Sequence, residues 1–126
     1  MIAKNKRNII DKKIFSSIKN LHEGTFLYVN YPFCLNHCQF CIYKICRYNK
    51  KDSDLFTRYL RKEISLYSKI LNQKHFKFKN IHFGGGTPNL ISPEALIKPL
   101  RSLIDFNNIK HFVIEAFPRN NLSNYR

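Results

Sequence analysis

The pattern of hydrophobic and polar positions predicts three β-strands separated by helices. Residues 25–31, 80–83 and 110–116 are rich in aromatic and β-branched side chains, which favour strands, and each ends close to a glycine or a proline.

The alternation of aromatic residues and lysines over His75–Lys79 could stack nucleic-acid bases beside phosphates. It also fits a further half-buried strand, which is the interpretation we favour.

Two segments between these strands have helical periodicity. Asp52 or Ser53 can cap the first, whose apolar positions recur every three or four residues: Phe56, Leu60, Ile64, Tyr67 and Leu71. The second begins at Ser92-Pro93-Glu94, and its expected buried face comprises Leu96, Leu100, Leu103 and Ile104. Pro99 interrupts this second segment, so we expect a kink or an irregular turn there.

Residues 1–24 form a basic leader. Its apolar residues fall at roughly helical spacing, which predicts a short amphipathic helix broken by His22-Glu23-Gly24. Residues 25–126 then make up the main domain, since a chain of 126 residues is about the size of one domain and can bury a core.

Three cysteines, Cys34, Cys38 and Cys41, lie within eight residues in the pattern C-x3-C-x2-C. Thiolates spaced so closely can surround a compact soft-metal centre, and three of them would leave one iron of a 4Fe–4S cluster without a cysteine ligand. Cys46 could instead complete a structural zinc site, but the chain has no second C-x2-C pair, so we favour the cluster. For Cys46 we favour a structural role, either as a surface thiol or as a buried cysteine packed like a small apolar side chain.

The order of the predicted elements indicates an α/β fold with a parallel sheet. Ligands bind such sheets beyond the carboxyl ends of the strands. The cysteine loop follows the first strand, Gly84-Gly85-Gly86-Thr87-Pro88 follows the second, and Glu115 lies at the end of the third. These features should therefore share one edge of the sheet, where adjacent glycines let backbone N–H groups approach a ligand.

The motifs resemble those of a known family. The strand Tyr28–Cys34 (YVNYPFC), the cysteine loop and Gly84–Pro88 together look like a radical S-adenosylmethionine (radical SAM) enzyme. More narrowly, they are similar to the oxygen-independent coproporphyrinogen III oxidases (dehydrogenases) and their haem-chaperone relatives. The matching stretch runs from about Tyr28 to Pro118. It implies a partial (β/α) barrel, of which residues 25–126 would be the N-terminal part with about three βα units.

The resemblance also implies roles for individual residues. Cys34, Cys38 and Cys41 would ligate three irons, while S-adenosyl-L-methionine (SAM) would chelate the fourth. Six further residues would contact SAM: Tyr28, Phe40, Gly85, Gly86, Thr87 and Glu115. From the residues alone, aromatics such as Tyr28 and Phe40 are more often part of a core, and Glu115 could be a paired barrel residue.

The activity implied by the resemblance is that of a radical SAM oxidoreductase. In this family a reduced cluster cleaves SAM to a 5'-deoxyadenosyl radical, and the named relatives act on coproporphyrinogen III in haem biosynthesis. The resemblance implies a small-molecule substrate, with porphyrinogens among the candidates, and a reductase or flavodoxin-like electron donor. Tyr43 stands where the oxidases have a further cysteine and Asn30 replaces a common histidine, so a haem-chaperone relative or another radical SAM branch fits about as well as an oxidase. The alternative to an enzyme is a non-catalytic haem- or iron–sulfur-binding module.

Charge changes this picture little. Lysine and arginine total 22 against 8 acidic residues, a formal charge of +14, which in general favours nucleic acid, anionic membranes or acidic substrates. The basic residues are spread along the chain, so a zinc-binding nucleic-acid module is our least favoured hypothesis. No N-terminal apolar run suggests export or a membrane span, and with four cysteines we expect a soluble cytoplasmic protein.

Overall fold

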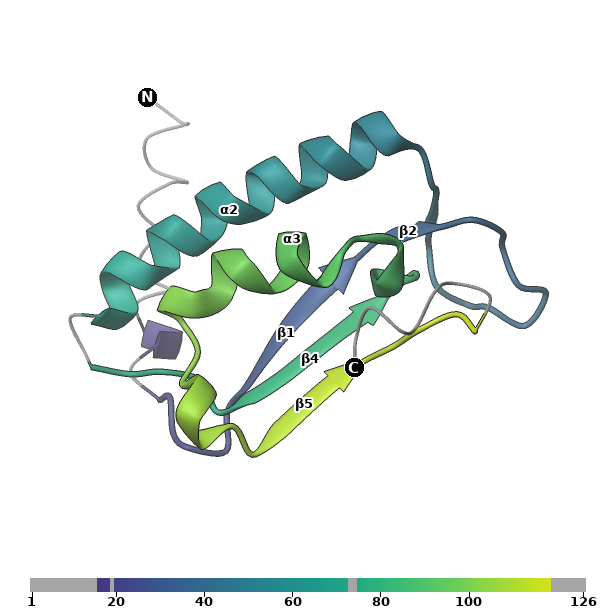
Figure 1. The fold of residues 1–126 in the computed structure, drawn as a ribbon. Coiled ribbons are helices and arrows are strands. Elements are labelled where there is room, and N and C mark those ends of the chain that lie inside the picture. Colours follow the sequence, from purple (N-terminus) through teal and green to yellow (C-terminus); the bar gives the residue numbers. More distant parts are fainter. Residues whose placement is uncertain (1–15, 19, 73–74, 119–126) are drawn as a thin grey trace, which may run out of the picture.

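The computed structural model describes residues 16–18, 20–72 and 75–118. Its centre is a three-stranded parallel sheet in the order β1-β4-β5, formed by β1 (Phe26–Tyr31), β4 (Asn80–Gly85) and β5 (His111–Ile114). Helical segments lie across one face of this sheet (Figure 1). The expected α/β class with a parallel sheet is confirmed.

The first helix, α2 (Lys50–Asn72), begins earlier than the sequence suggested. The side chain of Asn49 accepts a hydrogen bond from the backbone N–H of Asp52 at 2.8 Å, so Asn49 caps the helix. The prediction of a cap at Asp52 or Ser53 was wrong, because both residues already lie in the first turns. Over the described residues, every helix is too short or too polar to cross a lipid bilayer.

The second helical segment is irregular, as the interior proline predicted. It consists of α3 (Pro93–Ile97) followed by the 3-10 helix η2 (Lys98–Ser102), with Pro99 in the first turn of η2. Proline has no N–H to continue the α-helical pattern, so the tighter turn takes over there. Two more 3-10 turns flank this segment: η1 (Pro88–Leu90) and η3 (Phe106–Asn108).

The core lies between the sheet and the helices. Tyr31 and Phe83 are fully buried there, together with residues of both helical segments that include Ile64, Leu71, Leu96 and Leu100. The hydroxyl of Tyr31 lies 2.7 Å from Ser53 Oγ of α2, so this buried polar group has a hydrogen-bond partner. Alternation places Phe26 and Tyr28 on the opposite sheet face, where each is 52% exposed.

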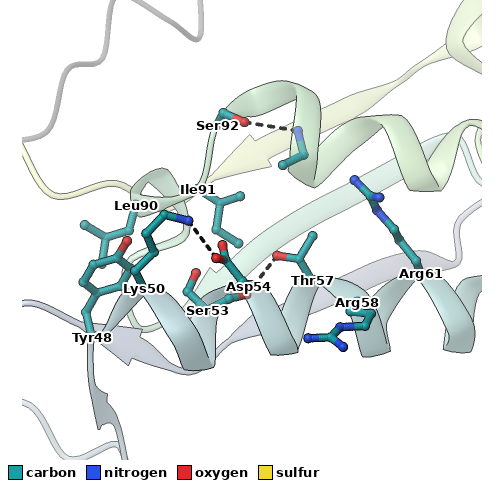
Figure 2. A pocket seen from close by; sticks show the side chains of 11 residues that line it. Tyr48, Lys50, Ser53, Asp54, Thr57, Arg58, Arg61, Leu90, Ile91 and Ser92 are labelled. Atoms are coloured by element: carbon teal, nitrogen blue, oxygen red, sulfur yellow. Dashed lines mark hydrogen bonds and ion pairs between the residues drawn. The ribbon is translucent and has the colours of Figure 1, made fainter.

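A cavity of about 520 Å³ lies between α2 and the η1–α3 segment (Figure 2). Several of its polar groups bond within α2 itself: Lys50 pairs with Asp54 at 2.7 Å, and the hydroxyl of Thr57 donates to the Ser53 carbonyl. Arg58 and Arg61 also line it, but their guanidinium groups point in different directions. No set of groups converges on a ligand there.

Two expectations about other segments had different outcomes. The strand predicted over His75–Lys79 was wrong: His75 has a positive φ of 53°, and the stretch pairs only through a single bridge between Phe78 and Ile104. Phe76 and Phe78 instead pack edge to face, with their ring centroids 5.1 Å apart. Of the predicted leader, residues 16–18 are helical, while residues 1–15 and 19 lie outside the described residues.

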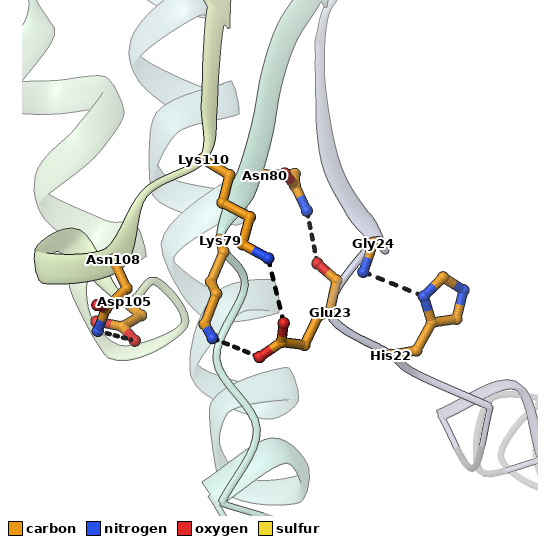
Figure 3. Close-up of polar contacts among 8 residues, drawn as sticks. All are labelled: His22, Glu23, Gly24, Lys79, Asn80, Asp105, Asn108 and Lys110. Atoms are coloured by element: carbon orange, nitrogen blue, oxygen red, sulfur yellow. Dashed lines mark hydrogen bonds and ion pairs between the residues drawn. The ribbon is translucent and has the colours of Figure 1, made fainter.

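Glu23 connects the amino-terminal ends of all three strands (Figure 3). It precedes β1, and its carboxylate pairs with Lys79 before β4 at 2.6 Å and with Lys110 before β5 at 3.1 Å. The Asn80 side chain also donates to the carbonyl oxygen of Glu23 at 2.7 Å. Hydrogen bonds from Lys79, which has the larger effect, and from Lys110 lower the pKa of Glu23 from 4.5 to about 2.

We expect Glu23→Gln to destabilise the chain in a pH-dependent way. The folded-state pKa lies below the unfolded one, so the stabilisation is complete above about pH 4.5 and is lost as the pH falls towards 2. The unfolding midpoints in urea of wild type and Glu23→Gln should therefore differ at pH 7 and converge near pH 2.

High salt should also reduce this difference, because the carboxylate is exposed. Glu63→Gln is the matched control, since Glu63 is exposed on α2 and makes no hydrogen bond or ion pair with other described residues. A difference between wild type and Glu23→Gln that does not change with pH would contradict this account.

Candidate functional site

The residues singled out in the sequence gather at the carboxyl edge of the sheet. A cavity of about 280 Å³ there is lined by all three motif cysteines, Phe40, Gly85–Thr87 and Glu115. Tyr28 lines an adjoining cavity of about 150 Å³ that it shares with Gly85, Gly86 and Glu115. The structure thus places the nine predicted site residues around two neighbouring cavities.

The base of the cysteine loop is closed by a second, two-stranded sheet. In it, β2 (Phe33–Cys34) pairs in parallel with β3 (Cys46–Arg47). The backbone N–H of Cys46 donates to the Pro32 carbonyl at 2.8 Å, and that of Tyr48 donates to the Cys34 carbonyl at 2.8 Å. Residues 35–45 therefore form a loop whose two ends lie side by side. Cys38 and Cys41 belong to this loop, and Cys34 lies at its start.

The glycine loop packs directly against the start of the cysteine loop. Gly86 donates its N–H to the Tyr31 carbonyl at 2.6 Å, and Thr87 donates its N–H to the Phe33 carbonyl at 2.8 Å. Gly85 has a φ of +105°, which favours glycine. A Cβ atom on Gly86 would lie 2.5 Å from the Phe33 oxygen and 3.0 Å from Cys34 Sγ. Glycine is therefore needed at position 85 for the backbone conformation of the turn. It is needed at position 86 so that the loop can pack closely against Phe33 and Cys34.

The donor set suits a soft-metal cluster. All four cysteines are free thiols, and the three motif cysteines line one cavity from a single loop. In a 4Fe–4S cluster each cysteine binds a different iron, so the sulfurs surround the cluster and do not meet at one ion. Among the described residues, no three His, Cys, Asp or Glu side chains are placed to hold a single metal ion.

Glu115 is held by its neighbours on β4. Its Oε1 atom lies 2.8 Å from His82 Nε2, and its Oε2 atom accepts a hydrogen bond from the Gly85 N–H at 3.3 Å. Tyr28 packs edge-on against His82, with ring centroids 5.2 Å apart. Burial raises the pKa of Tyr28, and the negative charge of Glu115 raises it further. The Tyr28 hydroxyl therefore stays protonated at neutral pH and can donate a hydrogen bond.

The sequence did not single out His82, because its place in the site depends on strand register. It occupies the position of the second strand that lies beside Tyr28 in the parallel register. The interpretation of Glu115 as a paired residue is therefore what the structure shows, with His82 as its hydrogen-bond partner. The pair is half-exposed at the cavity, so pairing does not bury the carboxylate.

The interpretation of Tyr28 and Phe40 as core aromatics was wrong, whereas Cys46 is a surface thiol, one of the two forms expected for it. Tyr28 is 52% exposed and Phe40 is 87% exposed, so neither is a core aromatic. Beside Phe40, Ile42 is also exposed, and both lie on the loop between β2 and β3. Cys46 is an exposed thiol rather than a buried one, and it does not line the cavity of the other three cysteines.

The segment after β5 is also held by the side-chain amide of Asn89 in η1. Asn89 donates from its side chain to the Phe117 carbonyl at 3.2 Å and accepts from the Phe117 N–H at 3.1 Å. The side chain of Asn89 thereby imitates the backbone of a neighbouring strand. This contact keeps residues 115–117 against the cavity wall, where Glu115 contributes its carboxylate.

The chain is similar in sequence to known proteins over part of its length. The chain is 29% identical over 83 residues to the zebrafish (Danio rerio) radical S-adenosyl methionine domain-containing protein 1, mitochondrial, covering 66% of this chain and 18% of that protein. It is 37% identical over 71 residues to the oxygen-independent coproporphyrinogen III oxidase of Pseudomonas aeruginosa, covering 56% and 15%. It is 30% identical over 77 residues to anaerobilin synthase of Escherichia coli O157:H7, covering 61% and 17%.

These matches have a defined extent. The chain spans less than a quarter of the length of the curated relatives it matches. No protein-family model matches the chain, and no solved structure matches it significantly. The resemblance expected from the cysteine and glycine motifs is nevertheless confirmed: over part of their length, this chain is similar in sequence to radical SAM proteins and, among them, to the oxygen-independent coproporphyrinogen III oxidases.

Proposed function

We propose that this chain supplies the part of a radical SAM protein that holds a 4Fe–4S cluster and SAM. Residues 25–126 would form the N-terminal βα units of a partial barrel. One observation carries the proposal: three free cysteines, a glycine loop and a carboxylate line one cavity at the carboxyl edge of a parallel sheet. Parallel sheets bind their ligands at that edge.

Cys34, Cys38 and Cys41 are the proposed cluster ligands. Three thiolates satisfy three irons and leave the fourth for the amino and carboxylate groups of SAM. Cys46 is left out of the ligand set because it belongs to β3 and lies outside the cavity. When bound and reduced, the cluster supplies the electron that cleaves SAM to a 5'-deoxyadenosyl radical.

The other cavity residues would bind and orient SAM. The half-exposed Glu115 carboxylate, held by His82, can accept a hydrogen bond from an N–H of the SAM amino group. Gly85 and Gly86 let the backbone come close to the ligand without a side chain in the way. Phe40 is exposed and offers a flat face on which an adenine ring can stack, while the protonated Tyr28 hydroxyl can donate a hydrogen bond.

For the whole protein we propose a radical SAM oxidoreductase acting on a small molecule. Two relatives reported above are named for coproporphyrinogen III oxidation and anaerobilin synthesis, so a porphyrinogen is the first substrate to test. A reductase or flavodoxin-like protein in the cytoplasm would supply the electron. Neither nucleic acid nor zinc enters this proposal.

Anaerobic reconstitution with iron and sulfide tests the cluster assignment. We expect about four irons and four acid-labile sulfides per chain, and loss of most of both in Cys34→Ala, Cys38→Ala and Cys41→Ala. Cys46→Ala is the matched control and should keep the wild-type content. One zinc per chain with four sulfur neighbours, lost in Cys46→Ala, would refute the proposal.

The same reconstituted chain tests reductive cleavage. After chemical reduction with SAM present, chromatography should detect 5'-deoxyadenosine and methionine in equal amounts. A stable cluster that yields no 5'-deoxyadenosine would contradict the catalytic proposal and favour a haem- or iron–sulfur-binding module.

Glu115→Gln should weaken SAM binding. Replacing the carboxylate removes a hydrogen bond to a charged group, which is worth about 1.5–3 kcal/mol, so we expect the dissociation constant to rise by about tenfold or more. Calorimetric titration of the reconstituted chain measures it, with Glu63→Gln as the control. Unchanged affinity at equal cluster content would show that Glu115 does not contact SAM.

A further inference from the structure

The side chain of Thr87 has an unexpected partner. Its hydroxyl donates a hydrogen bond to Cys34 Sγ, with 3.2 Å between oxygen and sulfur. Thr87 is 7% exposed, so water has little access to this contact. The bond joins the glycine loop after β4 to the first cysteine of the motif.

The hydroxyl of Thr87 makes this bond in place of an ordinary local one. Thr87 stands at the N-cap of η1, where threonine hydroxyls commonly bond the backbone of the following turn, yet it makes no side-chain capping bond. Its backbone is fixed independently, since its N–H donates to the Phe33 carbonyl at 2.8 Å. The position of the hydroxyl relative to Cys34 is therefore set by the fold.

Cys34 is held from the other side as well. The Cys34 carbonyl accepts a hydrogen bond from the Tyr48 N–H. Gly86 lies so close to the Cys34 sulfur that a Cβ atom on residue 86 would be 3.0 Å from it. Among the described residues, neither Cys38 Sγ nor Cys41 Sγ accepts a hydrogen bond from a side chain, and the Cys41 thiol donates to the Tyr43 carbonyl at 4.0 Å. The three thiols are thus not equivalent, because one sulfur alone has a built-in donor.

We propose that Thr87 is a positioning residue that tunes the reduction potential of the cluster through Cys34, and this inference rests on the proposed function. A hydrogen bond to a cluster thiolate favours the state with more negative charge. The cluster gains one negative charge when it takes one electron from an external one-electron reductant, so the Thr87 hydroxyl raises the potential. The family resemblance implied a contact of Thr87 with SAM, whereas in the structure its hydroxyl donates to Cys34, a proposed cluster ligand.

An electrochemical titration of the reconstituted chain without SAM, monitored by electron paramagnetic resonance, tests the inference. At a fixed potential, Thr87→Val should lower the ratio of reduced to oxidised cluster by about tenfold, which corresponds to a shift of 59 mV to more negative potential for a one-electron couple. Thr87→Ser keeps the hydroxyl and should retain the wild-type potential. Thr57→Val makes the same chemical change in α2, where the hydroxyl donates to the Ser53 carbonyl, and should also leave the potential unchanged.

The outcomes separate this inference from the proposed function. A wild-type chain that forms no cluster overturns both. A cluster whose potential is the same in Thr87→Val and wild type overturns the role of Thr87 alone, as does an equal shift in Thr87→Ser. If Thr87→Val takes up less iron than wild type, Thr87→Ala removes the hydroxyl without the added methyl group, and the same shift is expected in its loaded fraction.

Discussion

The pairing of β4 with a parallel strand on each side is the constraint on which the rest of this structure depends. Its register sets Tyr31 beside Gly85 and Phe83 beside Ile114, so the three strands end at nearly the same level. Every loop that leaves a strand there must begin at the same edge of the sheet. Because parallel strands need long crossovers, the helical segments also end up together on one face, where they bury the core.

The two loops at that edge are joined more tightly than sheet pairing alone requires. The glycine loop donates two backbone hydrogen bonds and one side-chain hydrogen bond to residues 31–34. This contact is possible because Gly86 has no side chain where the cysteine strand passes. Chemistry at the first cysteine is therefore tied to the conformation of a segment more than fifty residues away in the chain.

The sequence predicted the large-scale arrangement well, because it depends on patterns that repeat along each element. Strand positions, the irregular turn at Pro99 and the shared edge all follow from periodicity and chain order. Contacts between elements were harder to foresee. The bond from Thr87 to Cys34, the pairing of β2 with β3 and the role of His82 depend on register, which a single sequence does not specify. The strand expected over His75–Lys79 failed for the same reason, since alternation says nothing about whether a partner strand is available.

The exposed ring of Phe40 and its neighbour Ile42 have a thermodynamic consequence. Both side chains are almost entirely in water, at 87% and 90% exposure, on a loop whose ends are tied together. Any molecule that settles over this loop removes apolar surface from water, which lowers the heat capacity of the complex relative to its separate parts. The enthalpy of binding at this edge would then change with temperature, because apolar surface loses its hydration.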